Sequence, residues 1–564
     1  MEKNMTNPMD ETLQKTLAGC RFAFVAVAAF SILINLLMLT VPIYTLQLYD
    51  RVLASQSTDT LLYLTLIAVF CIVIYAFLEW LRGRISAEVA HWLDGHLSPA
   101  MIAKGIDRLL LGDRYAYQSQ RDIGLLKNFL KSPSFFTFLD LPWFPIYVVA
   151  VFIISGLLGV ITLIGAGILF FLAYLNQKMS SADLHRANQL SSRNQNSVDV
   201  VLDHAETVQA MGMMSAFLEK WTVNNQEMLA LQSHSAQHVG SISATSKFFR
   251  IIIQIAVLAV GGYLAIEGDL TGGAMIASSI IAGRALAPVE QFISAWKDFF
   301  SAKEALQRLR KFISLPQLRE KNIALPKAVG NVACEQLIYM PPGAEQPLLN
   351  NIQFALLAGE SLAVLGSSGA GKSTLARLLL GVFKPTRGAV RLDGADVYTW
   401  DRKDFGAQVG YLPQDNGLIP GTVKDNIACL EKNYDESDVV AAAKMANAHE
   451  MILHLPKGYN TLIHEFQLAG GQAKRVALAR TFYKNPRFIV LDEPETHLDV
   501  DGEKALLQAV EKILSEKATT LIIITRHLKL IQMMEKTLVL KNGLMQAIGP
   551  TQEILTQLQQ RPQA

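Results

Sequence analysis

A glycine-rich run in the second half of the chain has the composition and spacing of a phosphate-binding loop. The run GSSGAGKST fits the pattern G-x-x-x-x-G-K-[ST], follows the strand-like segment SLAVL and opens the helical segment LARLLLG. In such a loop backbone N–H groups close around phosphates, Lys372 reaches the outer phosphates, and Ser373 offers a hydroxyl to Mg²⁺. A chance glycine-rich turn is disfavoured because a strand precedes the run and a helix follows it. The predicted nucleotide-binding residues are Gly366, Ser367, Ser368, Gly369, Ala370, Gly371, Lys372, Ser373 and Thr374.

Two acidic residues end the hydrophobic segment FIVLDEP, which is typical of a buried strand. Asp492 is suited to bind Mg²⁺, and Glu493 is suited to polarise a water that attacks the terminal phosphate. Acids at the end of a strand are often merely solvated, but their occurrence together with Lys372 favours a functional role. We predict Asp492 and Ser373 as metal ligands, and Glu493 and Lys372 as catalytic residues.

A second glycine pair begins another helix about a hundred residues after the first loop. In FQLAGGQAKRVALAR, two glycines and a glutamine stand directly before a helical pattern. A helix that starts in this way is suited to bind an anion. Because the first loop already supplies a complete phosphate cradle, the sequence raises the question of whose phosphate this helix would bind.

Long apolar stretches occupy the chain before about residue 290 and predict six membrane spans. The segments Phe22–Leu46 and Thr60–Leu81 are each long enough to cross a hydrocarbon core of about 30 Å. Residues 136–175 can cross twice, with a turn at ISGLLG, and residues 248–266 and 272–287 add two more spans. A cleaved signal peptide is disfavoured because the first apolar run is too long and a second span follows closely.

Basic residues predict the orientation of these spans. Lysine and arginine gather in segments 82–131 and 178–247, whereas the opposite loops hold Arg51 and almost nothing else. Because basic residues accumulate on cytoplasmic loops, both termini are expected to be cytoplasmic. Residues 184–221 show helical spacing without proline, so the spans are expected to continue as long helices into the cytoplasm.

After residue 287 the long apolar stretches end. A charged helix follows, and then a linker that contains prolines. Beyond the linker, β-branched runs alternate with helical patterns, which indicates a mostly parallel sheet with covering helices. The predicted fold is a membrane α-helical domain of six spans, followed by a cytoplasmic α/β P-loop nucleotide-binding domain. The predicted domains are an N-terminal cytoplasmic segment 1–20, a membrane domain 21–313 with helical extensions, a linker 314–330 and a nucleotide-binding domain 331–564.

Bulk composition limits the classes of partner. The chain of 564 residues is 51% hydrophobic and carries a formal net charge of +2. This charge gives no reason to expect nucleic acid as a partner, whereas the apolar stretches predict contact with membrane lipid. The four cysteines, Cys20, Cys71, Cys334 and Cys429, lack the spacing of a zinc site or a disulfide framework.

Together these motifs resemble the nucleotide-binding domain of ABC transporters. The segment LAGGQ is similar to that family's LSGGQ motif, which closes over ATP held by the other subunit of a head-to-tail dimer. The resemblance therefore implies that the second helix start binds the phosphate of a partner chain. The residues implied in this contact are Leu468, Ala469, Gly470, Gly471 and Gln472.

Other matches to the family follow in its order. Gln414 in VGYLPQD resembles the glutamine that senses Mg²⁺ and faces the membrane domain, which implies that Gln414 binds the nucleotide and the metal. Asp499 in THLD matches the aspartate of the dimer contact. Tyr339 is the aromatic residue closest to the position that stacks on the base in the family. The resemblance implies ATP and Mg²⁺ as cofactors.

Two positions depart from the family pattern. The serine of LSGGQ is Ala469 here, so one hydrogen bond to phosphate is lost. The family's switch histidine occurs as T-H-R, but this chain reads Thr525, Arg526, His527. We predict that His527 is catalytic, although either His527 or Arg526 could face the phosphate. Both departures predict slower hydrolysis that is not abolished.

The membrane half resembles bacterial type I protein-secretion transporters of the protease- and hemophore-exporting group. The resemblance rests on INLLMLTVPIYTLQLYDRVLASQSTDTLLYLTLIAVF, ETVQAMGM and GRALAPVEQ. It implies a multi-pass protein of the bacterial inner membrane that exports an unfolded polypeptide with a C-terminal secretion signal, together with a periplasmic adaptor and an outer-membrane channel. About 20 residues precede the first span, so the N-terminal peptidase domain of bacteriocin exporters is not expected.

Two alternative functions stay open at the level of sequence. One is a lipid, drug or peptide exporter, which would differ in the walls of the membrane domain. Polar residues within the spans, Asn35, Glu79 and Arg284, fit either a transport path or contacts between helices. The other alternative is a catalytically weak regulatory half-transporter, paired with an active chain in a heterodimer rather than a homodimer.

Overall fold

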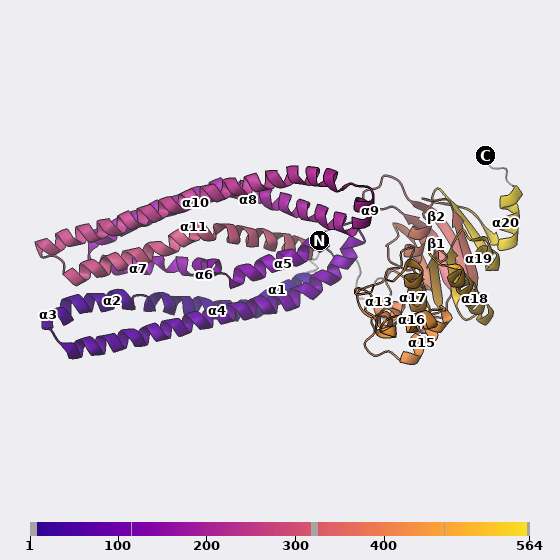
Figure 1. The fold of residues 1–564 in the computed structure, drawn as a ribbon, viewed down its shortest axis with the longest axis horizontal. Coiled ribbons are helices and arrows are strands. Elements are labelled where there is room, and N and C mark those ends of the chain that lie inside the picture. The colour runs from indigo at the N-terminus through magenta and orange to yellow at the C-terminus, as the bar shows by residue number, and fades with distance from the viewer. Residues whose placement is uncertain (1–7, 114, 317–324, 467, 561–564) are drawn as a thin grey trace, which may run out of the picture. The chain divides into compact units, whose positions relative to one another are not determined.

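The computed structural model describes residues 8–113, 115–316, 325–466 and 468–560. The chain divides into two compact units, with the division between them at residues 317–318. The secondary structure described in the first unit consists of helices joined by short turns, and the second unit combines strands with helices (Figure 1). Residues 1–7 of the predicted N-terminal segment and residues 317–324 of the predicted linker lie outside the described residues.

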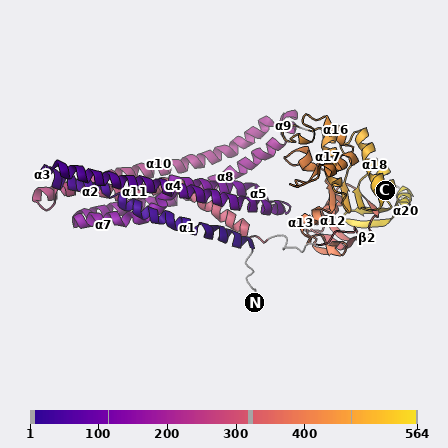
Figure 2. The same ribbon diagram turned by 90° about the horizontal axis from the view of Figure 1, so that it is seen from below.

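Six helical segments of the first unit are long and apolar enough to cross a membrane, as predicted. Several of them run lengthwise beside one another, including α8 with α10 and α10 with α11 (Figure 2). The elements are α1 (Pro8–Leu37), α2 (Thr40–Gln47), η1 (Leu48–Val52), α3 (Leu53–Ser55), α4 (Thr58–Leu109), α5 (Tyr115–Lys131), α6 (Pro133–Asp140), η2 (Leu141–Trp143), α7 (Phe144–Ile154), α8 (Gly156–Asp203), α9 (Ala205–Ala210), α10 (Met214–Glu267) and α11 (Gly272–Ser314).

The first predicted span is not a single helix. Helix α1 ends at Leu37, α2 begins at Thr40, and the chain continues through the π-helix η1. Pro42 has no backbone N–H to bond the carbonyl four residues before it, so the break at residues 38–39 has a local cause. The turn predicted at ISGLLG is confirmed, because Ser155 adopts an extended conformation between α7 and α8, which pack against each other.

The spans continue as long helices, as the sequence predicted. Helices α4, α8, α10 and α11 contain 52, 48, 54 and 43 residues. A helix of 50 residues is about 75 Å long, far more than a hydrocarbon core of about 30 Å. One difference concerns residues 184–221, which are not one continuous helix: Gly212 has a positive φ of 64° and turns the chain between α9 and α10.

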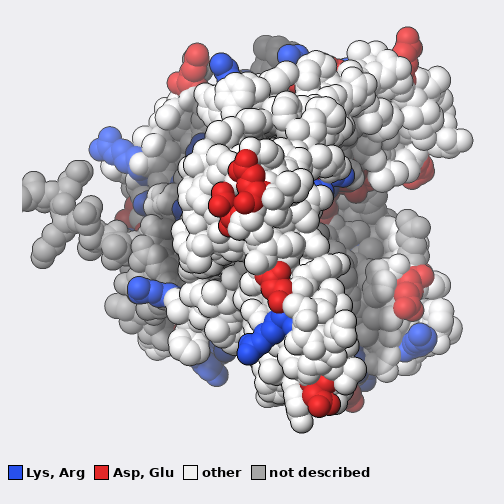
Figure 3. All heavy atoms as spheres, turned by 90° about the vertical axis from the view of Figure 1, so that its left-hand side faces the viewer, with Lys and Arg blue, Asp and Glu red and all other residues white. Residues whose placement is uncertain are grey.

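One end of the first unit, which holds α3 and the turn between α10 and α11, carries acidic side chains among mostly uncharged ones (Figure 3). In segments 48–60 and 267–271, Arg51 is the single basic residue. Asp50 joins the two segments, since it accepts hydrogen bonds from the backbone N–H of Gly273 at 2.9 Å and from the hydroxyl of Thr271 at 2.5 Å. The scarcity of basic residues here is the feature from which the orientation was predicted.

Two of the polar residues singled out within the spans make contacts inside the protein. The Asn35 side-chain amide donates to Asp140 at 3.1 Å and so joins α1 to α6. The buried Arg82 guanidinium binds Asp140 at 2.8 Å and Glu79 at 2.9 Å. Asn35 and Glu79 therefore belong to contacts within and between helices. Arg284, in contrast, is exposed on α11.

Asp140→Ala is expected to lower the free energy of unfolding by about 3 kcal/mol, because it removes a main partner of a buried arginine. SDS titration of the purified protein, followed by the loss of helical circular dichroism, measures the change. The matched control is Asp94→Ala, which breaks the more exposed 2.6 Å ion pair between Asp94 and Lys127 and should cost at most about 1 kcal/mol. Equal shifts in the two variants would contradict a structural role for the Asp140 network.

The described strands of the second unit form two sheets. An antiparallel sheet has the order β2-β1-β4-β5, and a larger sheet has the order β10-β9-β3-β8-β7-β6, in which only β10 runs antiparallel to its neighbour. The predicted mostly parallel sheet is therefore confirmed. The strands are β1 (Val332–Tyr339), β2 (Leu349–Leu356), β3 (Ser361–Gly366), β4 (Arg387–Leu392), β5 (Ala395–Asp396), β6 (Val409–Leu412), β7 (Phe488–Asp492), β8 (Thr520–Ile524), β9 (Lys536–Lys541) and β10 (Leu544–Pro550).

Two hydrophobic cores enclose the central strands of the larger sheet. Ala363, Ile489 and Ile523 pack into one core, and their neighbours Val364 and Val490 pack into the other. Alternate residues of a strand point to opposite faces, so these strands are buried on both sides, which explains their continuous apolar runs. The helices of the unit are α12 (Lys372–Leu379), α13 (Arg402–Gly406), α14 (Val423–Ile427), α15 (Glu436–Met445), α16 (His449–Leu453), η3 (Gly458–Asn460), α17 (Gly470–Phe482), α18 (Val500–Glu516), α19 (Leu528–Met533) and α20 (Thr551–Gln560).

Candidate functional site

The predicted chemical groups meet at one edge of the larger sheet. Strands β3, β8, β7 and β6 are consecutive and parallel, so the loops that follow them leave from the same edge. These loops carry the glycine-rich run, the Thr525–His527 segment, Glu493 and Gln414. Ligands of open parallel sheets bind outside the carboxyl ends of the strands, and this edge is therefore the candidate site.

The glycine-rich loop connects β3 directly to α12. Gly369 and Gly371 have φ values of 80° and 94°, a region that favours glycine. A Cβ atom at Gly371 would lie 2.7 Å from the Leu349 side chain, so there is also no room for a side chain there. The loop thus directs its backbone toward the start of α12, where the N–H groups of the first turn have no partner within the helix.

Lys372, the first residue of α12, lies across this loop. Its Nζ atom donates to the carbonyl oxygens of Gly366 at 2.9 Å and Ser367 at 3.0 Å. Burial lowers the pKa of Lys372, and the positive charge of Arg526 lowers it further. A phosphate group at this edge would offer the ammonium an anion in place of two neutral carbonyl groups.

Asp492 and Ser373 form the part of the site that fits a divalent cation. Asp492 ends β7, is 1% exposed, and accepts a hydrogen bond from the Ser373 hydroxyl. Burial raises the pKa of Asp492, and its Oδ1 atom is buried without a hydrogen-bond partner among the described residues. A hydroxyl beside a carboxylate oxygen that lacks a partner is the kind of oxygen donor set that Mg²⁺ prefers.

Glu493 has an uncommon backbone conformation. Its φ of 47° lies in the left-handed region, and its backbone N–H donates to the Ile524 carbonyl of β8 at 2.8 Å. The Gln414 side-chain amide donates to the Glu493 carboxylate at 3.1 Å. A strained backbone conformation of this kind persists when the surroundings fix it, and it often marks a functional residue. The structure therefore joins two residues that the sequence singled out separately.

The loop after β8 separates the two candidate switch residues. His527 lies with its Nε2 atom 3.0 Å from Glu503 of α18, and its Nδ1 atom is buried without a partner among the described residues. Arg526, by contrast, is close enough to Lys372 to lower its pKa. Glu495 anchors the loop by accepting a 2.6 Å hydrogen bond from Thr525. The structure thus pairs His527 with Glu503, whereas the positive charge of Arg526 lowers the pKa of Lys372.

Tyr339 is placed differently from the expectation of a base-stacking aromatic. The residue ends β1, is 7% exposed, and belongs to the core beneath the glycine-rich loop. Its ring stacks on Phe383 with a centroid distance of 5.3 Å and an angle of 5°. Because the ring is buried by this packing, the structure does not present Tyr339 to a nucleotide base.

The LAGGQ segment lies at the start of α17. Ala469 is exposed and caps the helix, and its backbone N–H donates to the Gln472 side chain at 3.1 Å. Helix α17 packs against α14, α15 and β6, whereas α12 packs against β3, β7 and β8. The exposed start of α17 is therefore supported by different elements from those that support the glycine-rich loop and α12 of the same chain.

Two basic residues of α17 hold the Gln414 loop, and the sequence analysis missed both. The fully buried Lys474 donates to the carbonyl oxygens of Pro413 at 3.4 Å and Gln414 at 3.2 Å, and Arg480 donates to Gly417 at 2.7 Å. Burial lowers the pKa of Lys474. The sequence does contain a signal for the burial of Lys474: this lysine lies one helical turn before Leu478, on the same face as apolar residues.

Asp499 is the N-cap of α18. It accepts hydrogen bonds from the backbone N–H of Gly502 at 2.9 Å and from Arg475 of α17 at 2.5 Å. The Arg475 hydrogen bond is the main cause that lowers the pKa of Asp499. Within one chain, Asp499 thus joins α17, which begins at the LAGGQ segment, to α18.

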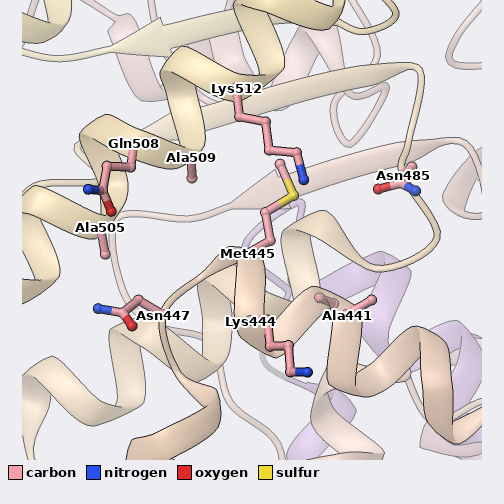
Figure 4. Close-up of a pocket in the computed structure, with 10 residues that line it drawn as sticks. Ala441, Lys444, Met445, Asn447, Asn485, Ala505, Gln508, Ala509 and Lys512 are labelled. Carbon is pink, nitrogen blue, oxygen red and sulfur yellow. The ribbon is translucent and has the colours of Figure 1, made fainter.

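A separate hollow of about 520 Å³ lies between α15 and α18 (Figure 4). Lys512 and Met445 project into it from opposite helices. None of the predicted site residues lines this hollow, which therefore is not the nucleotide site.

Comparisons with known proteins agree with this geometry. Residues 349–496 match the family model described as "ABC transporter", and residues 117–286 match the "ABC transporter transmembrane region". The chain is similar to a solved bacterial Atm1-family ABC exporter with ATP bound, with a TM-score of 0.80, 22% identity, and coverage of 97% of this chain and 100% of that one. The fold is therefore that of an ABC exporter.

Sequence relatives specify the group within this family. The chain is 35% identical over 553 residues to the type I secretion system ATP-binding protein PrsD of Rhizobium meliloti (strain 1021), covering 97% of this chain and 94% of PrsD. It is 27% identical to the α-hemolysin translocation ATP-binding protein HlyB of Escherichia coli O6:H1, covering 95% of this chain and 77% of HlyB. This chain belongs to the ABC transporters, among the type I secretion ATP-binding proteins, and couples ATP hydrolysis to protein export.

Proposed function

We propose that this chain is the energising half-transporter of a type I secretion system in the bacterial inner membrane. Its cargo is an unfolded polypeptide with a C-terminal secretion signal, and its partners are a periplasmic adaptor and an outer-membrane channel. The nucleotide-binding domain and both termini are cytoplasmic. The observation that carries the proposal is the meeting of the glycine-rich loop, Asp492, Glu493 and Gln414 at one sheet edge, in a chain with six candidate spans.

In the proposed site, different residues of the chain perform different steps of ATP hydrolysis. The backbone of Gly366–Thr374 and the Lys372 ammonium bind the phosphates. Glu493, oriented by Gln414, accepts the proton of the attacking water. Ser373, Gln414 and Asp492 would hold Mg²⁺, which when bound neutralises charge on the phosphate oxygens. Arg526 supplies fixed positive charge next to Lys372 in place of the family's switch histidine.

The LAGGQ segment acts on the nucleotide of a second copy of the chain. The start of α17 is exposed and rests on elements other than those that hold α12, so a head-to-tail dimer brings Leu468–Gln472 to the partner's phosphates. A helix N-terminus is suited to such an anion contact. Asp499, next to α17 through Arg475, adds a polar contact across the same interface.

Crosslinking between two copies of the chain tests this dimer. In a background free of native cysteines and carrying Glu493→Gln, cysteines replace Ser368 in one tagged copy and Ala469 in the other. Ala469 is preferred to Gly471, where a Cβ atom would lie 3.1 Å from the His497 carbonyl. ATP with Mg²⁺ is expected to produce crosslinks between the two copies. A cysteine at Ser515, on the exposed far end of α18, serves as the control and should not crosslink. Crosslinks that form equally without nucleotide would contradict the model.

Removal of the signal from the cargo tests the direction of transport and its substrate. When the chain, its adaptor and its channel are co-expressed with a cargo protein, deletion of the cargo's C-terminal segment is expected to abolish secretion, because that segment carries the signal. Deletion of an internal segment of equal length is the control. Undiminished secretion of the C-terminally truncated cargo would exclude a C-terminal signal.

A second candidate function is a regulatory half-transporter in a heterodimer. Ala469 lacks the hydroxyl that the family uses at this position, and His527 is paired with Glu503. The presence of Lys372, Asp492 and Glu493 at one edge favours the catalytically active homodimer. ATP turnover by the purified chain alone separates the two functions, since a regulatory half would show none that depends on Glu493. A lipid, drug or peptide exporter would be identified by the transported substrate.

A further inference from the structure

Two adjoining hollows lie between α5, α8 and α11 of the helical unit. Their volumes are about 340 Å³ and 550 Å³. The two hollows share Gln118, Asn188, Ser192 and Arg308, so they form one continuous depression, which we call the polar groove. Along α8 the lining extends from His185 to Asn196, a length of about 16 Å, which equals roughly five residues of an extended chain.

Carboxamide and hydroxyl groups dominate the walls of the polar groove. Six of the lining residues are amides, namely Gln118, Asn188, Gln189, Gln195, Asn196 and Gln307. Each amide carries a carbonyl oxygen and two N–H donors, which match the C=O and N–H groups of a peptide backbone whatever its side chains are. Gln118, Asn188, Gln189 and Gln195 each use one donor within the protein, which leaves the second donor and the oxygen. Leu125 is the single large apolar residue among those that line the groove, so the walls offer little surface for a lipid tail or an apolar drug.

The charges of the groove are not balanced. The two acidic lining residues, Asp122 and Glu304, are buried and already engaged: Arg308 binds Asp122 through two hydrogen bonds of 2.8 and 2.9 Å, and Asn188 donates to Glu304 at 3.1 Å. Arg193 and Lys311 line the same groove and have no ion-pair partner among the described residues. The accessible charge of the groove is therefore positive.

We propose that the polar groove binds an extended, acidic segment of the polypeptide cargo. The amide-lined walls bind the backbone without regard to sequence, and Arg193 with Lys311 select acidic side chains. The proposal rests on the proposed export of unfolded polypeptides and adds to it a binding site and a charge preference. An unfolded chain fits because its backbone groups are free to bond with the walls, whereas a folded domain has paired its own.

Binding of labelled peptides to the full chain in lipid nanodiscs tests the charge preference. The probes are a fluorescein-labelled peptide of repeated Ser-Gly-Glu triplets and its Ser-Gly-Lys counterpart. The Glu peptide is expected to bind more tightly, and Arg193→Gln combined with Lys311→Gln should weaken its binding roughly three- to tenfold. The matched control is Lys220→Gln combined with Lys303→Gln, which removes two positive charges from the same unit but outside the groove. The affinity of this control for the Glu peptide should stay within about twofold of the parental affinity, because exposed charges contribute little. Equal losses in both double variants would overturn the proposal.

Photo-crosslinking locates the bound peptide. A benzoylphenylalanine side chain at Gln189, within the groove, should capture the Glu peptide, whereas the same group at Ser197, exposed on α8 outside both hollows, should not. Capture of a second copy of the chain from position 189 would show that a subunit interface covers the groove, and would overturn the proposal. Unchanged cargo secretion together with unchanged peptide binding in the Arg193/Lys311 variant would also overturn it. In that case polypeptide export would still stand, since its own test is the C-terminal truncation of the cargo.

Discussion

Glu493→Gln is expected to lower the rate of ATP hydrolysis by about 10²- to 10⁴-fold, the usual contribution of a general base. Glutamine has nearly the same shape, so the left-handed backbone at position 493 and the contact with Gln414 can persist while the proton acceptor is lost. ATP binding should therefore remain close to that of the parent protein. Phosphate release by the reconstituted protein measures turnover, and a fluorescent ATP analogue measures binding.

The control for this prediction is Glu516→Gln, at the exposed end of α18 and outside the site. This variant should hydrolyse ATP at the parental rate. If Glu493→Gln retained a tenth or more of the parental turnover, Glu493 would not be the general base. Simultaneous loss of ATP binding would instead indicate that the substitution disturbs the phosphate cradle.

Arg526→Ala is expected to slow hydrolysis by about 10²- to 10³-fold, the effect commonly seen when one group aimed at developing charge is removed. The reason is that Arg526 carries a fixed positive charge in the loop after β8, at the sheet edge proposed to bind the phosphates. His527→Gln should have a smaller effect, because the His527 side chain is engaged with Glu503 at 3.0 Å. A larger loss for His527→Gln than for Arg526→Ala would show that the histidine is the switch residue.

The pH dependence of two further variants separates charge from shape at position 526. Arg526→Lys keeps a positive charge and should retain more activity than Arg526→Ala. Arg526→His should regain activity as the pH falls through about 6.5, since a histidine is charged only below its pKa, whereas the parental arginine keeps its charge throughout that range. A pH profile of Arg526→His that is parallel to the parental profile would contradict the role of charge.

The local motifs could be predicted from the sequence because the physics that defines them is local. A phosphate loop needs glycines at fixed spacing between a strand and a helix, so Gly366–Thr374 were identifiable from their order alone. Apolar runs long enough to cross a lipid bilayer are equally visible along the chain, and the described residues contain six helical segments that are long and apolar enough to span one. Buried parallel strands ending in polar residues identified Asp492 and Glu493 in the same way.

The breaks within the helices were harder to predict because small local preferences decide them. Pro42 and Gly212 are single residues in otherwise helical patterns, and each pattern alone predicted one continuous segment. The surroundings of Tyr339 were hard to predict for a different reason. Whether an aromatic ring faces a ligand or the core depends on its neighbours, and Phe383, which covers this ring, lies 44 positions away in the sequence.

The sequence by itself determined which residues can do chemistry, and the tertiary structure decided which of them act together. Strand order brings the ends of β3, β8, β7 and β6 to one edge, and this order is set by packing on both faces of the sheet rather than by position in the chain. The same packing turns His527 to Glu503, places Arg526 where it acts on Lys372, and buries Lys474 beneath the Gln414 loop. The positions of these charged side chains depend on contacts between segments that are distant in the sequence. The periodicity of residues along the chain gives no information about such contacts.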